Sequence, residues 1–449
     1  RKGYLMNNID AKTSFTIMGF LLLIVGILQS WGVAFSILNL CLISAIMSMG
    51  VNIQWGFAGL INFGVMGFLA IGGLATVLIS VPPVVESWSA GGLGILISLI
   101  FLIFIIYMCL FINKRYSNYK YKYHLIFAII ILTIPALKLI SGPSIKLIES
   151  INPAAQGYLG GLGLPIIFSW FVGGLLSAAI AFVIGKICLG LRSDYLAIST
   201  LLISGIIVSV IKHEEWLSRG VKNVIGLKRP APYEVDLQNS EWFINFIELI
   251  HFWAPTTKGI IISSSGLFVK LCFTIIFLIT LLILLYLSER AVNSPWGRMM
   301  RAIRDNETAA KAMGKNIVKQ QLNIFMIGSA IIGFAGAMLV TYDGLFTPSS
   351  YQPLRYTFLI WVMVLLGGSG NNYGAILGGF VVWFIWIESA PIALFLINIF
   401  TFFLENNNAF KMHLIESVPY FRYLMMGVGL LLVMRYKPEG LLPEKKIKF

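Results

Sequence analysis

Long runs of apolar residues, each close to the thickness of a lipid bilayer, set the strongest limit on how this chain can fold. A membrane-spanning helix needs about 20 mostly apolar residues. Because backbone polar groups must find partners inside the bilayer, such runs are expected to be helical. They lie near 15–31, 33–55, 57–80, 91–112, 123–141, 164–190, 195–211, 266–288, 321–341, 355–370, 374–390 and 418–434. We predict an all-α polytopic membrane bundle of about ten to twelve spans, some broken by glycine, forming a single domain over 1–449.

Composition supports a membrane protein and argues against nucleic acid as a partner. Hydrophobic residues make up 58% of the chain and charged residues 12%, too few charges to cover a soluble fold of this size. The net charge of +14 comes from basic residues clustered between apolar runs, which the positive-inside rule explains. The four cysteines, Cys41, Cys109, Cys188 and Cys272, lie far apart in apolar runs and show neither disulfide nor metal-site spacing.

The charges between the apolar runs predict an orientation. The segments 113–122, 294–320 and the tail after Arg435 are strongly basic, whereas 142–163, 342–356 and 405–422 are nearly charge-free or balanced. The long 212–265 segment carries six basic and six acidic residues. Alternation across twelve spans places both termini and 294–320 in the cytoplasm and 212–265 outside. The 212–265 loop is predicted to be a folded cap with interfacial aromatics, and a docking surface for a soluble partner is compatible with that.

The 294–320 segment is basic and patterned for two short helices. It holds six basic and two acidic side chains. Trp296, Met299, Met300 and Ile303 follow helical spacing and form one apolar stripe. Ser294 and Pro295 supply an N-cap and a first-turn proline, Asn306 can cap a second helix over 307–313, and Gly314 would end it. A paired-helix element at the membrane surface is what a pore subunit needs to bind a soluble motor.

Two glycine-rich stretches interrupt spans. In the second, Gly367–Gly374, we favour close helix packing by Gly374 and Gly378. The first stretch runs from Gly56 through Gly59 to Gly64, and polar amides lie beside it. A broken helix with inward amides predicts a translocation path lined by Asn52, Gln54, Gly56, Gly59, Asn62 and Gly64. Hydrogen bonds between helices are an equally good explanation of the amides.

The chain lacks the motifs of an enzyme or a self-powered transporter. It contains no phosphate-binding G-x-x-x-x-G-K-[ST] loop, no dinucleotide fingerprint and no paired metal-ligand spacing. Glu388 and Asp194 are the carboxylates nearest to the interior of spans, and both are predicted at span ends. We therefore expect no catalytic activity, no cofactor and no metal, and a chain that draws its energy from a partner.

The Ser294–Gly314 stretch resembles the cytoplasmic loop of the branched-chain amino-acid permeases, the LivM-type membrane subunits of ATP-binding cassette importers. Four further stretches resemble the same family in the expected order, namely Gly56–Gly59, Leu191–Leu201, Val364–Gly378 and Arg435–Leu442. The resemblance implies a permease in a bacterial inner membrane, assembled with two cytoplasmic ATP-binding subunits, a second homologous permease and an extracytoplasmic solute-binding protein.

The resemblance also assigns a coupling role to the 294–320 loop. It implies that the apolar stripe packs into a groove of the ATPase, while Arg301 and Arg304 meet acidic groups there. The implied coupling residues are Trp296, Gly297, Arg298, Met299, Arg301, Arg304, Glu307, Ala310 and Gly314. The 91–141 hairpin and the 391–408 segment look like additions to the family pattern, with lipid-facing packing as their simplest role.

Several functions fit these observations to different degrees. An importer of branched-chain, hydrophobic amino acids comes first, and importers of urea, short amides or another amino acid would share the same fold and loop. A secondary carrier would need an essential carboxylate inside the membrane and no ATPase. A membrane-embedded enzyme would need clustered ionisable groups, whereas His124, His213, His251 and His413 are scattered.

Overall fold

The computed structural model describes residues 10–115, 121–152, 157–250, 257–403 and 408–444. Within these ranges, ten helices are long and apolar enough to cross a bilayer, which confirms the predicted all-α polytopic bundle. They are α1 (Ala11–Leu28), α2 (Trp31–Gln54), α5 (Leu93–Arg115), α6 (Lys122–Ser150), α7 (Ile167–Cys188), α8 (Ser193–His213), α12 (Lys258–Asn293), α15 (Ile317–Asp343), α17 (Asn372–Phe400) and α19 (Val418–Tyr436).

Two shorter apolar helices complete the predicted set of twelve. These are α3 (Val65–Ser80) and α16 (Leu359–Gly367), the latter continuing a π-helical turn, η3 (Leu354–Phe358). The expected span at 57–80 is wrong at its start, because the chain leaves the helix after Gln54 and resumes it at Val65. The expected end at residue 390 is also wrong. Helix α17 runs through Pro391 to Phe400, since neighbouring helices in a membrane protein can satisfy the backbone groups that proline frees.

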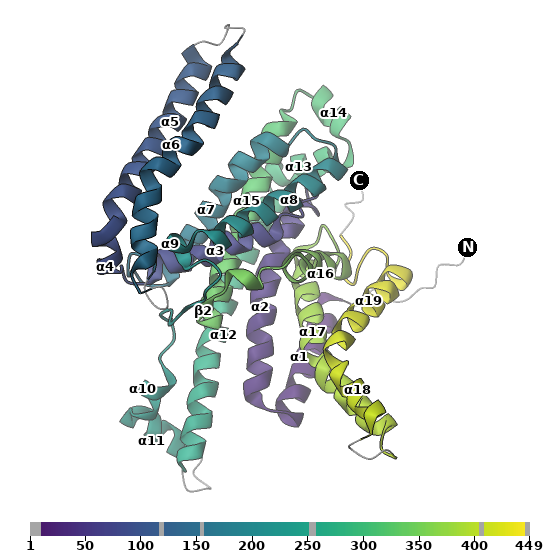
Figure 1. The fold of residues 1–449 in the computed structure, drawn as a ribbon. Coiled ribbons are helices and arrows are strands. Elements are labelled where there is room, and N and C mark those ends of the chain that lie inside the picture. Colours follow the sequence, from purple (N-terminus) through teal and green to yellow (C-terminus); the bar gives the residue numbers. More distant parts are fainter. Residues whose placement is uncertain (1–9, 116–120, 153–156, 251–256, 404–407, 445–449) are drawn as a thin grey trace.

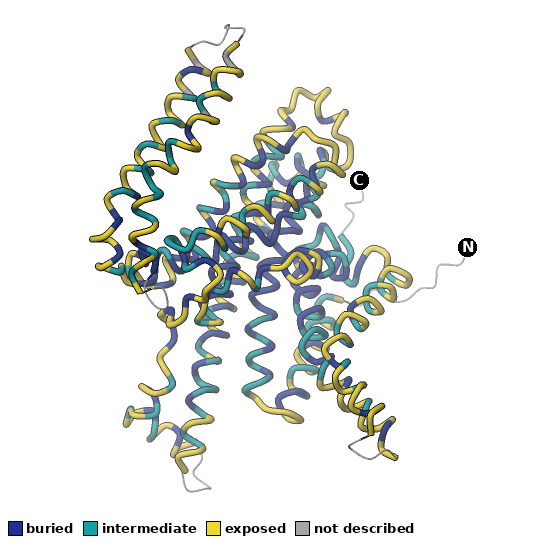
Figure 2. Tube along the Cα trace, in the orientation of Figure 1, coloured by how far each residue is buried: buried dark blue, intermediate teal, exposed yellow. Residues whose placement is uncertain are grey.

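Helices α2 and α15 form the centre of the bundle. Every residue from Cys41 to Gln54 on α2 is buried. Helix α15 packs against α2, α3 and α7, and α17 and α12 pack on other sides of α2 (Figure 1). Small residues allow these approaches, since a Cβ at Gly72 of α3 would overlap the carbonyl of Gly333 on α15. Figure 2 shows this buried centre, surrounded by helices with exposed outer faces.

The predicted extra hairpin stands apart from the bundle. It consists of a short turn, α4 (Val85–Ser87), a π-helical turn, η1 (Trp88–Gly92), and the long helices α5 and α6, so it extends beyond the predicted 91–141 at both ends. Figures 1 and 2 show it projecting from the body with exposed residues along most of its length, and many of these are large apolar side chains. Its base is attached where Val84 N donates to Leu159 O and Leu159 N donates to Trp216 O, at 3.1 and 3.0 Å.

The described part of the 212–265 loop is folded, as expected. It contains α9 (Glu215–Ser218), strand β1 (Val224–Ile225), α10 (Glu234–Gln238) and α11 (Glu241–Ile250). Strand β1 pairs antiparallel with β2 (Leu345–Phe346), with Val224 opposite Phe346. The predicted loop end at 265 is wrong, because α12 already begins at Lys258 and α10 packs against it.

The remaining elements lie at the two ends of the bundle. After α12 the chain forms α13 (Pro295–Asp305) and α14 (Glu307–Ala312), and the short turn η2 (Pro348–Ser350) and helix α18 (Ala409–Glu416) complete the fold. Figure 1 places α14, the end of α5 and the start of α6 at one end, and α10, α11 and α18 at the other. The helix ends that flank the basic segment 113–122 therefore lie at the same end as α14, in agreement with the alternation predicted from charge.

Candidate coupling and translocation site

The paired-helix element forms at the predicted residues. Ser294 Oγ accepts from Gly297 N at 3.4 Å and Pro295 occupies the first turn, so both N-terminal signals act as expected. Asn306 Oδ1 accepts from Ala309 N at 3.0 Å and caps α14. The second helix ends at Ala312, and Gly314 reverses the chain with a φ of +73°. Local sequence therefore determined this element, because each helix end carries its own capping residue.

The apolar stripe of α13 faces the chain's own helices. Met300 and Ile303 are 0% and 2% exposed, and Trp296 and Met299 pack partly buried against the same core. Trp296 and Met300 line an apolar cavity of about 310 Å³ together with residues of α2, α12 and α15. Met300 and Ile303 are therefore taken up by the chain's own core rather than by a groove of the ATPase, whereas a contact of Trp296 and Met299 with the ATPase stays a prediction. Helix α13 is amphipathic and short, and the nearest apolar surface that can bury its stripe is the chain itself.

Arg304 binds inside the chain as well, and its expected contact with acidic groups of the ATPase stays a prediction. Its Nη1 donates to the carbonyl of Gly56 and to Glu444 Oε2, the latter at 2.9 Å, and its Nε donates to Asp305 Oδ1 at 3.0 Å. Burial lowers the pKa of Arg304, but its hydrogen bonds to Glu444 and Asp305 raise it above the usual value. Arg304 thus links α13 to the start of the first glycine stretch and to the C-terminal segment.

Arg301 also forms a hydrogen bond within the chain, but a weaker one than those of Arg304. It is half-buried, and its Nη2 donates to Val292 O at 3.4 Å, a long hydrogen bond. Gly297 is buried where a Cβ would overlap the backbone of Val292, so α13 approaches the end of α12 closely.

The outward surface of the element is formed mainly by α14 and the turn that follows it. Arg298, Glu307 and Gly314 are exposed, and Ala310 is buried. Met313 is 78% exposed, the most exposed methionine of the described chain. A partner that approaches this end would therefore meet Met313 and Glu307 rather than the predicted stripe.

The amides beside the first glycine stretch bind one another and the backbone. We call residues 55–64, between α2 and α3, the first break. Asn52, Gln54 and Asn62 are all 0% exposed. Gln54 Nε2 donates to Phe325 O and Ser329 Oγ on α15 at 2.9 and 3.0 Å, and Asn62 Nδ2 donates to Gln54 Oε1 at 2.8 Å. The amides therefore hold the break in shape, which is the interhelical role left open from the sequence. A role for these six positions as a lining of the path stays a prediction.

The second glycine stretch is joined to the first. We call residues 368–371, between α16 and α17, the second break. Gly370 N donates to Asn52 Oδ1 at 2.9 Å, and Asn52 Nδ2 donates to Asn372 Oδ1 at 3.1 Å. Thr357 of η3 adds a link, because its Oγ1 accepts from Met66 N at the start of α3 at 3.2 Å. The two interrupted spans therefore share one hydrogen-bonded network.

The C-terminal segment closes this network, which the sequence did not predict. Leu441 N and Leu442 N donate to Leu366 O and Gly367 O, both at 2.9 Å, so residues 441–442 pair with the end of α16 like a short strand. Asn371 Nδ2 donates to Leu442 O at 3.2 Å. Within 435–442 the glycine and the following leucines gave no signal of this pairing, because strand-like pairing of two residues has no periodicity to detect.

Aromatic side chains, rather than amides, remain open at the breaks. Trp55 and Phe63 of the first break are half-buried, and each ring centroid lies 4.9 Å from that of Trp361 on α16. Phe358, 41% exposed, lies 5.7 Å from Phe63. The indole N–H of Trp361 donates to Asn62 O at 2.9 Å, which ties this cluster to the first break. The surface exposed by the two interrupted spans is thus apolar and aromatic.

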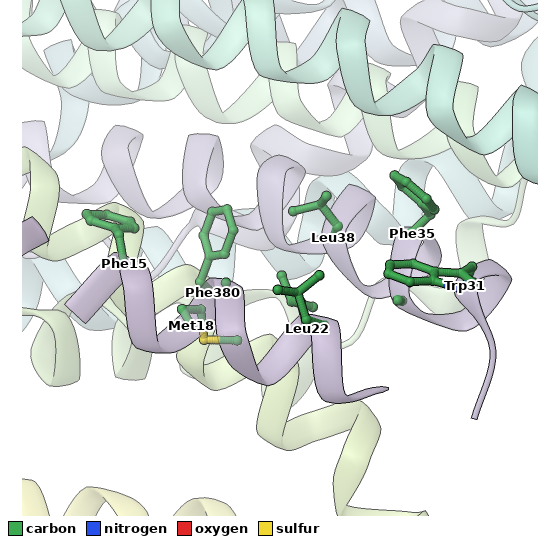
Figure 3. A pocket seen from close by; sticks show the side chains of 10 residues that line it. Phe15, Met18, Leu22, Trp31, Phe35, Leu38 and Phe380 are labelled. Atoms are coloured by element: carbon green, nitrogen blue, oxygen red, sulfur yellow. The ribbon is translucent and has the colours of Figure 1, made fainter. Parts of the chain in front are cut away.

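Other cavities lie on the outside of the bundle. Figure 3 shows an apolar groove of about 430 Å³ between α1 and α2, closed by Phe380 of α17. Its visible lining is Phe15, Met18, Leu22, Trp31, Phe35, Leu38 and Phe380. In the part of the chain that the structure describes, no three His, Cys, Asp or Glu side chains gather where they could hold a metal ion.

An all-α membrane bundle whose interrupted spans connect to a surface helix pair has the organisation of a transport subunit. A sequence profile described as the branched-chain amino acid transport system permease component matches residues 150–434, and the chain belongs to this family. The extra hairpin and the first break precede the matched residues.

Curated relatives agree with this family. The chain is 27% identical over 300 residues to the probable branched-chain amino acid transport permease protein LivM of Methanocaldococcus jannaschii, covering 66% of this chain and 73% of the relative. It is 26% and 25% identical to the high-affinity branched-chain amino acid transport system permease proteins LivM of Salmonella typhimurium and Escherichia coli. Those alignments cover 60% and 61% of this chain but span only 56% of each relative. No solved structure matches the chain.

Proposed function

We propose that this chain is the membrane-spanning permease subunit of an ATP-binding cassette importer for branched-chain, hydrophobic amino acids. It works with two cytoplasmic ATP-binding subunits, a second homologous permease and an extracytoplasmic solute-binding protein. Both termini lie on the cytoplasmic side of a bacterial inner membrane, and ATP is bound by the partners. Family membership and the names of the relatives support the class of solute. The orientation is supported by the position of α14 at the same end as the end of α5 and the start of α6, which flank the basic segment 113–122.

The observation that carries the coupling proposal is the position of Arg304. This one side chain binds the first break at Gly56 and, through Glu444, the segment that pairs beside the second break. A displacement of α13–α14 by the ATPases therefore acts on both interrupted spans together. Alternating access follows if the ATP-bound motor stabilises one arrangement of this network over the other.

The surface that meets the motor is α14 with the turn after it. Met313 offers an exposed apolar side chain, and Glu307 adds a charge at the start of the helix. Arg304 acts from within the permease by holding α13 against the breaks. In this arrangement the ATPases displace α14, and Arg304 couples that displacement to the two breaks.

The aromatic surface at the breaks supports an apolar solute. The half-buried rings of Trp55 and Phe63 and the exposed ring of Phe358 suit an aliphatic side chain, whereas urea or a short amide would need polar partners there. Purified complex in proteoliposomes tests this proposal directly. ATP-dependent uptake of leucine, isoleucine or valine is expected, with urea and acetamide excluded. Uptake of urea in preference to leucine would overturn the assignment of solute.

A secondary carrier remains a second candidate because of Glu388. The sequence placed this residue near a span end, yet it lies inside α17, which continues to Phe400, and is 4% exposed. Its Oε2 accepts from Gln29 Nε2 at 2.7 Å. A carrier driven by protons would need such a carboxylate. Glu388→Gln can keep the hydrogen bond, so an importer should retain ATP-driven uptake within about twofold, whereas uptake driven by a pH gradient and abolished in this variant would favour the carrier.

A further inference from the structure

A polar cavity lies between α13, the ends of α1 and α12, and the second break. Its volume is about 470 Å³, within the range of small-molecule sites. Charged residues of both signs line it, together with three asparagine amides. The lining residues used below are Lys12, Glu289, Asn293, Arg301, Asn372 and Glu444. It is unlike the apolar cavities described above, whose lining is almost wholly hydrocarbon.

On the acidic side of this cavity, Glu289 retains free hydrogen-bonding capacity. Its Oε1 accepts from Asn372 Nδ2 at 2.9 Å and its Oε2 from Asn293 Nδ2 at 3.2 Å. A carboxylate can accept about four hydrogen bonds. Among the residues that the structure describes, no cation lies within ion-pair distance of Glu289, although it is only half-exposed. The amides hold its position and leave its charge without a counter-ion.

The basic lining residues Arg301 and Lys12 likewise retain free hydrogen-bonding capacity and lack a counter-ion among the described residues. Arg301 is half-buried and makes a single long hydrogen bond of 3.4 Å to Val292 O, out of about five that a guanidinium can donate. Lys12 is exposed at the start of α1. Within the described ranges neither side chain forms an ion pair, whereas Glu444, which also lines the cavity, is already bound to Arg304.

From this arrangement we propose that the cavity is a binding site for a small zwitterion, with the ligand's ammonium on Glu289 and its carboxylate or phosphate on Arg301 and Lys12. A neutral ligand would leave both charges unsatisfied, and a ligand with one charge would satisfy only one side. Two sources carry this chemistry at the membrane surface, namely a free α-amino acid and the headgroup of phosphatidylethanolamine.

The position of the cavity gives the ligand a regulatory effect. Asn372 bridges Glu289 to Asn52, and Asn52 also binds Gly370 N, so a ligand on Glu289 bears on the network that joins the two breaks. Arg301 lies on α13, beside the α14 surface assigned to the motor. A bound zwitterion therefore links α12, α13 and the second break and resists their relative movement. Under the proposed function, on which the cytoplasmic placement rests, this is inhibition of import by amino acid that has accumulated inside.

Direct binding tests the site without requiring transport. The purified complex in phosphatidylglycerol nanodiscs, free of solute-binding protein and ATP, is titrated with L-leucine by calorimetry. Parallel titrations use 4-methylpentanoate, which lacks the ammonium, and 3-methylbutylamine, which lacks the carboxylate. Leucine should bind and both analogues should bind at least about tenfold more weakly, the loss expected for one charged hydrogen bond. Glu289→Gln and Lys12→Gln should each weaken leucine by a similar factor, whereas the control Glu86→Gln, on α4, should not.

Repeating the titration in phosphatidylethanolamine nanodiscs distinguishes the two sources. If leucine binds equally well in both lipids, the free amino acid is the ligand. If leucine binds in phosphatidylglycerol nanodiscs but not in phosphatidylethanolamine nanodiscs, the headgroup occupies the site. If leucine binds with equal affinity to wild type and Glu289→Gln, and phosphatidylethanolamine has no effect, the cavity is not a zwitterion site.

Uptake into proteoliposomes separates this proposal from the proposed function. Leucine preloaded inside should reduce wild-type uptake severalfold relative to empty vesicles, and Glu289→Gln should lose this reduction when normalised to its own uptake into empty vesicles. Absent uptake with intact Glu289-dependent binding would refute the importer and leave the site standing. If uptake is normal and internal leucine reduces it equally in wild type and Glu289→Gln, the importer stands and the proposed site is refuted.

Discussion

The two breaks in the spans are stabilised by opposite means. The first break, residues 55–64, is held by side chains, since Gln54 and Asn62 supply its hydrogen bonds. The second break, residues 368–371, is held mainly by backbone, since its neighbours pair with residues 441–442 and Gly368 adopts a φ of +120°, and Asn52 adds a side-chain link to Gly370 N. Removing one hydrogen-bonding side chain should therefore weaken the first break only partly. Adding a Cβ at a glycine of the second break should disrupt that break completely.

The largest effect is expected from Gly368→Ala. A Cβ at Gly368 would overlap the carbonyl of Leu442, and φ at this position disfavours any L side chain. Strain and overlap together should cost about 3 kcal/mol or more of unfolding free energy and release the C-terminal segment. Thermal unfolding in nanodiscs measures the loss.

A matched control exists for this substitution. No atom lies within 4 Å of a Cβ built at Gly427 in α19, so Gly427→Ala should be neutral or slightly stabilising. Equal thermal stability of the two alanine variants would show that the second break does not depend on close backbone contact.

A smaller but still large effect is expected from Asn52→Leu. The change removes the acceptor of Gly370 N and the donor to Asn372 Oδ1, which leaves buried polar groups unsatisfied at the second break. The cost should be about 2–3 kcal/mol. Because Asn52 and Asn372 bind each other, the double variant with Asn372→Leu should cost less than the sum of the two single variants. Strict additivity in this double-mutant cycle would mean that the two breaks are not coupled.

Much of this arrangement could be predicted from sequence where the signal is local. Apolar runs located twelve helices, and Ser294, Asn306 and Gly314 determined the paired-helix element because each acts within one turn of itself. Helix ends were less predictable. Pro391 looks like a helix end in isolation, and the residues just after Lys258 look like part of a loop. Packing against neighbouring helices nevertheless extends α17 beyond Pro391 and lets α12 begin at Lys258.

The sequence did not predict what each helix face contacts. The stripe of α13 and the charges of Arg301 and Arg304 were recognised, but the sequence alone offers no way to decide between a partner protein and the chain's own helices as their contact. The same holds for the amides of the first break. Their partners Phe325, Ser329 and Asn372 lie some 270 to 320 residues away, and no pattern reports a contact at that separation.

A modest effect on stability is expected from Glu444→Gln. The ion pair with Arg304 measures 2.9 Å, and both side chains are about one quarter exposed, so solvent screens their attraction. The change should cost at most about 1 kcal/mol. Under the proposed function, uptake per ATP hydrolysed should fall severalfold, because Arg304 would remain bound to Gly56 while its link to the C-terminal segment weakens from an ion pair to a neutral hydrogen bond. Unchanged transport stoichiometry would show that the second break does not depend on this pair.

The smallest effect on stability is expected from Met313→Asp, and it separates the inner from the outer surface of the paired-helix element. Met313 is 78% exposed, so replacing it should change unfolding free energy by no more than about 0.5 kcal/mol. Met300→Asp places the same charge at a fully buried site on α13 and should instead disrupt the fold. If α14 meets the ATPase, Met313→Asp should still insert and unfold like wild type but co-purify with less ATPase and lose ATP-driven uptake. Full ATPase recovery with normal uptake would remove α14 from the interface and return attention to the surface of Arg298 on α13, because the stripe itself is already buried.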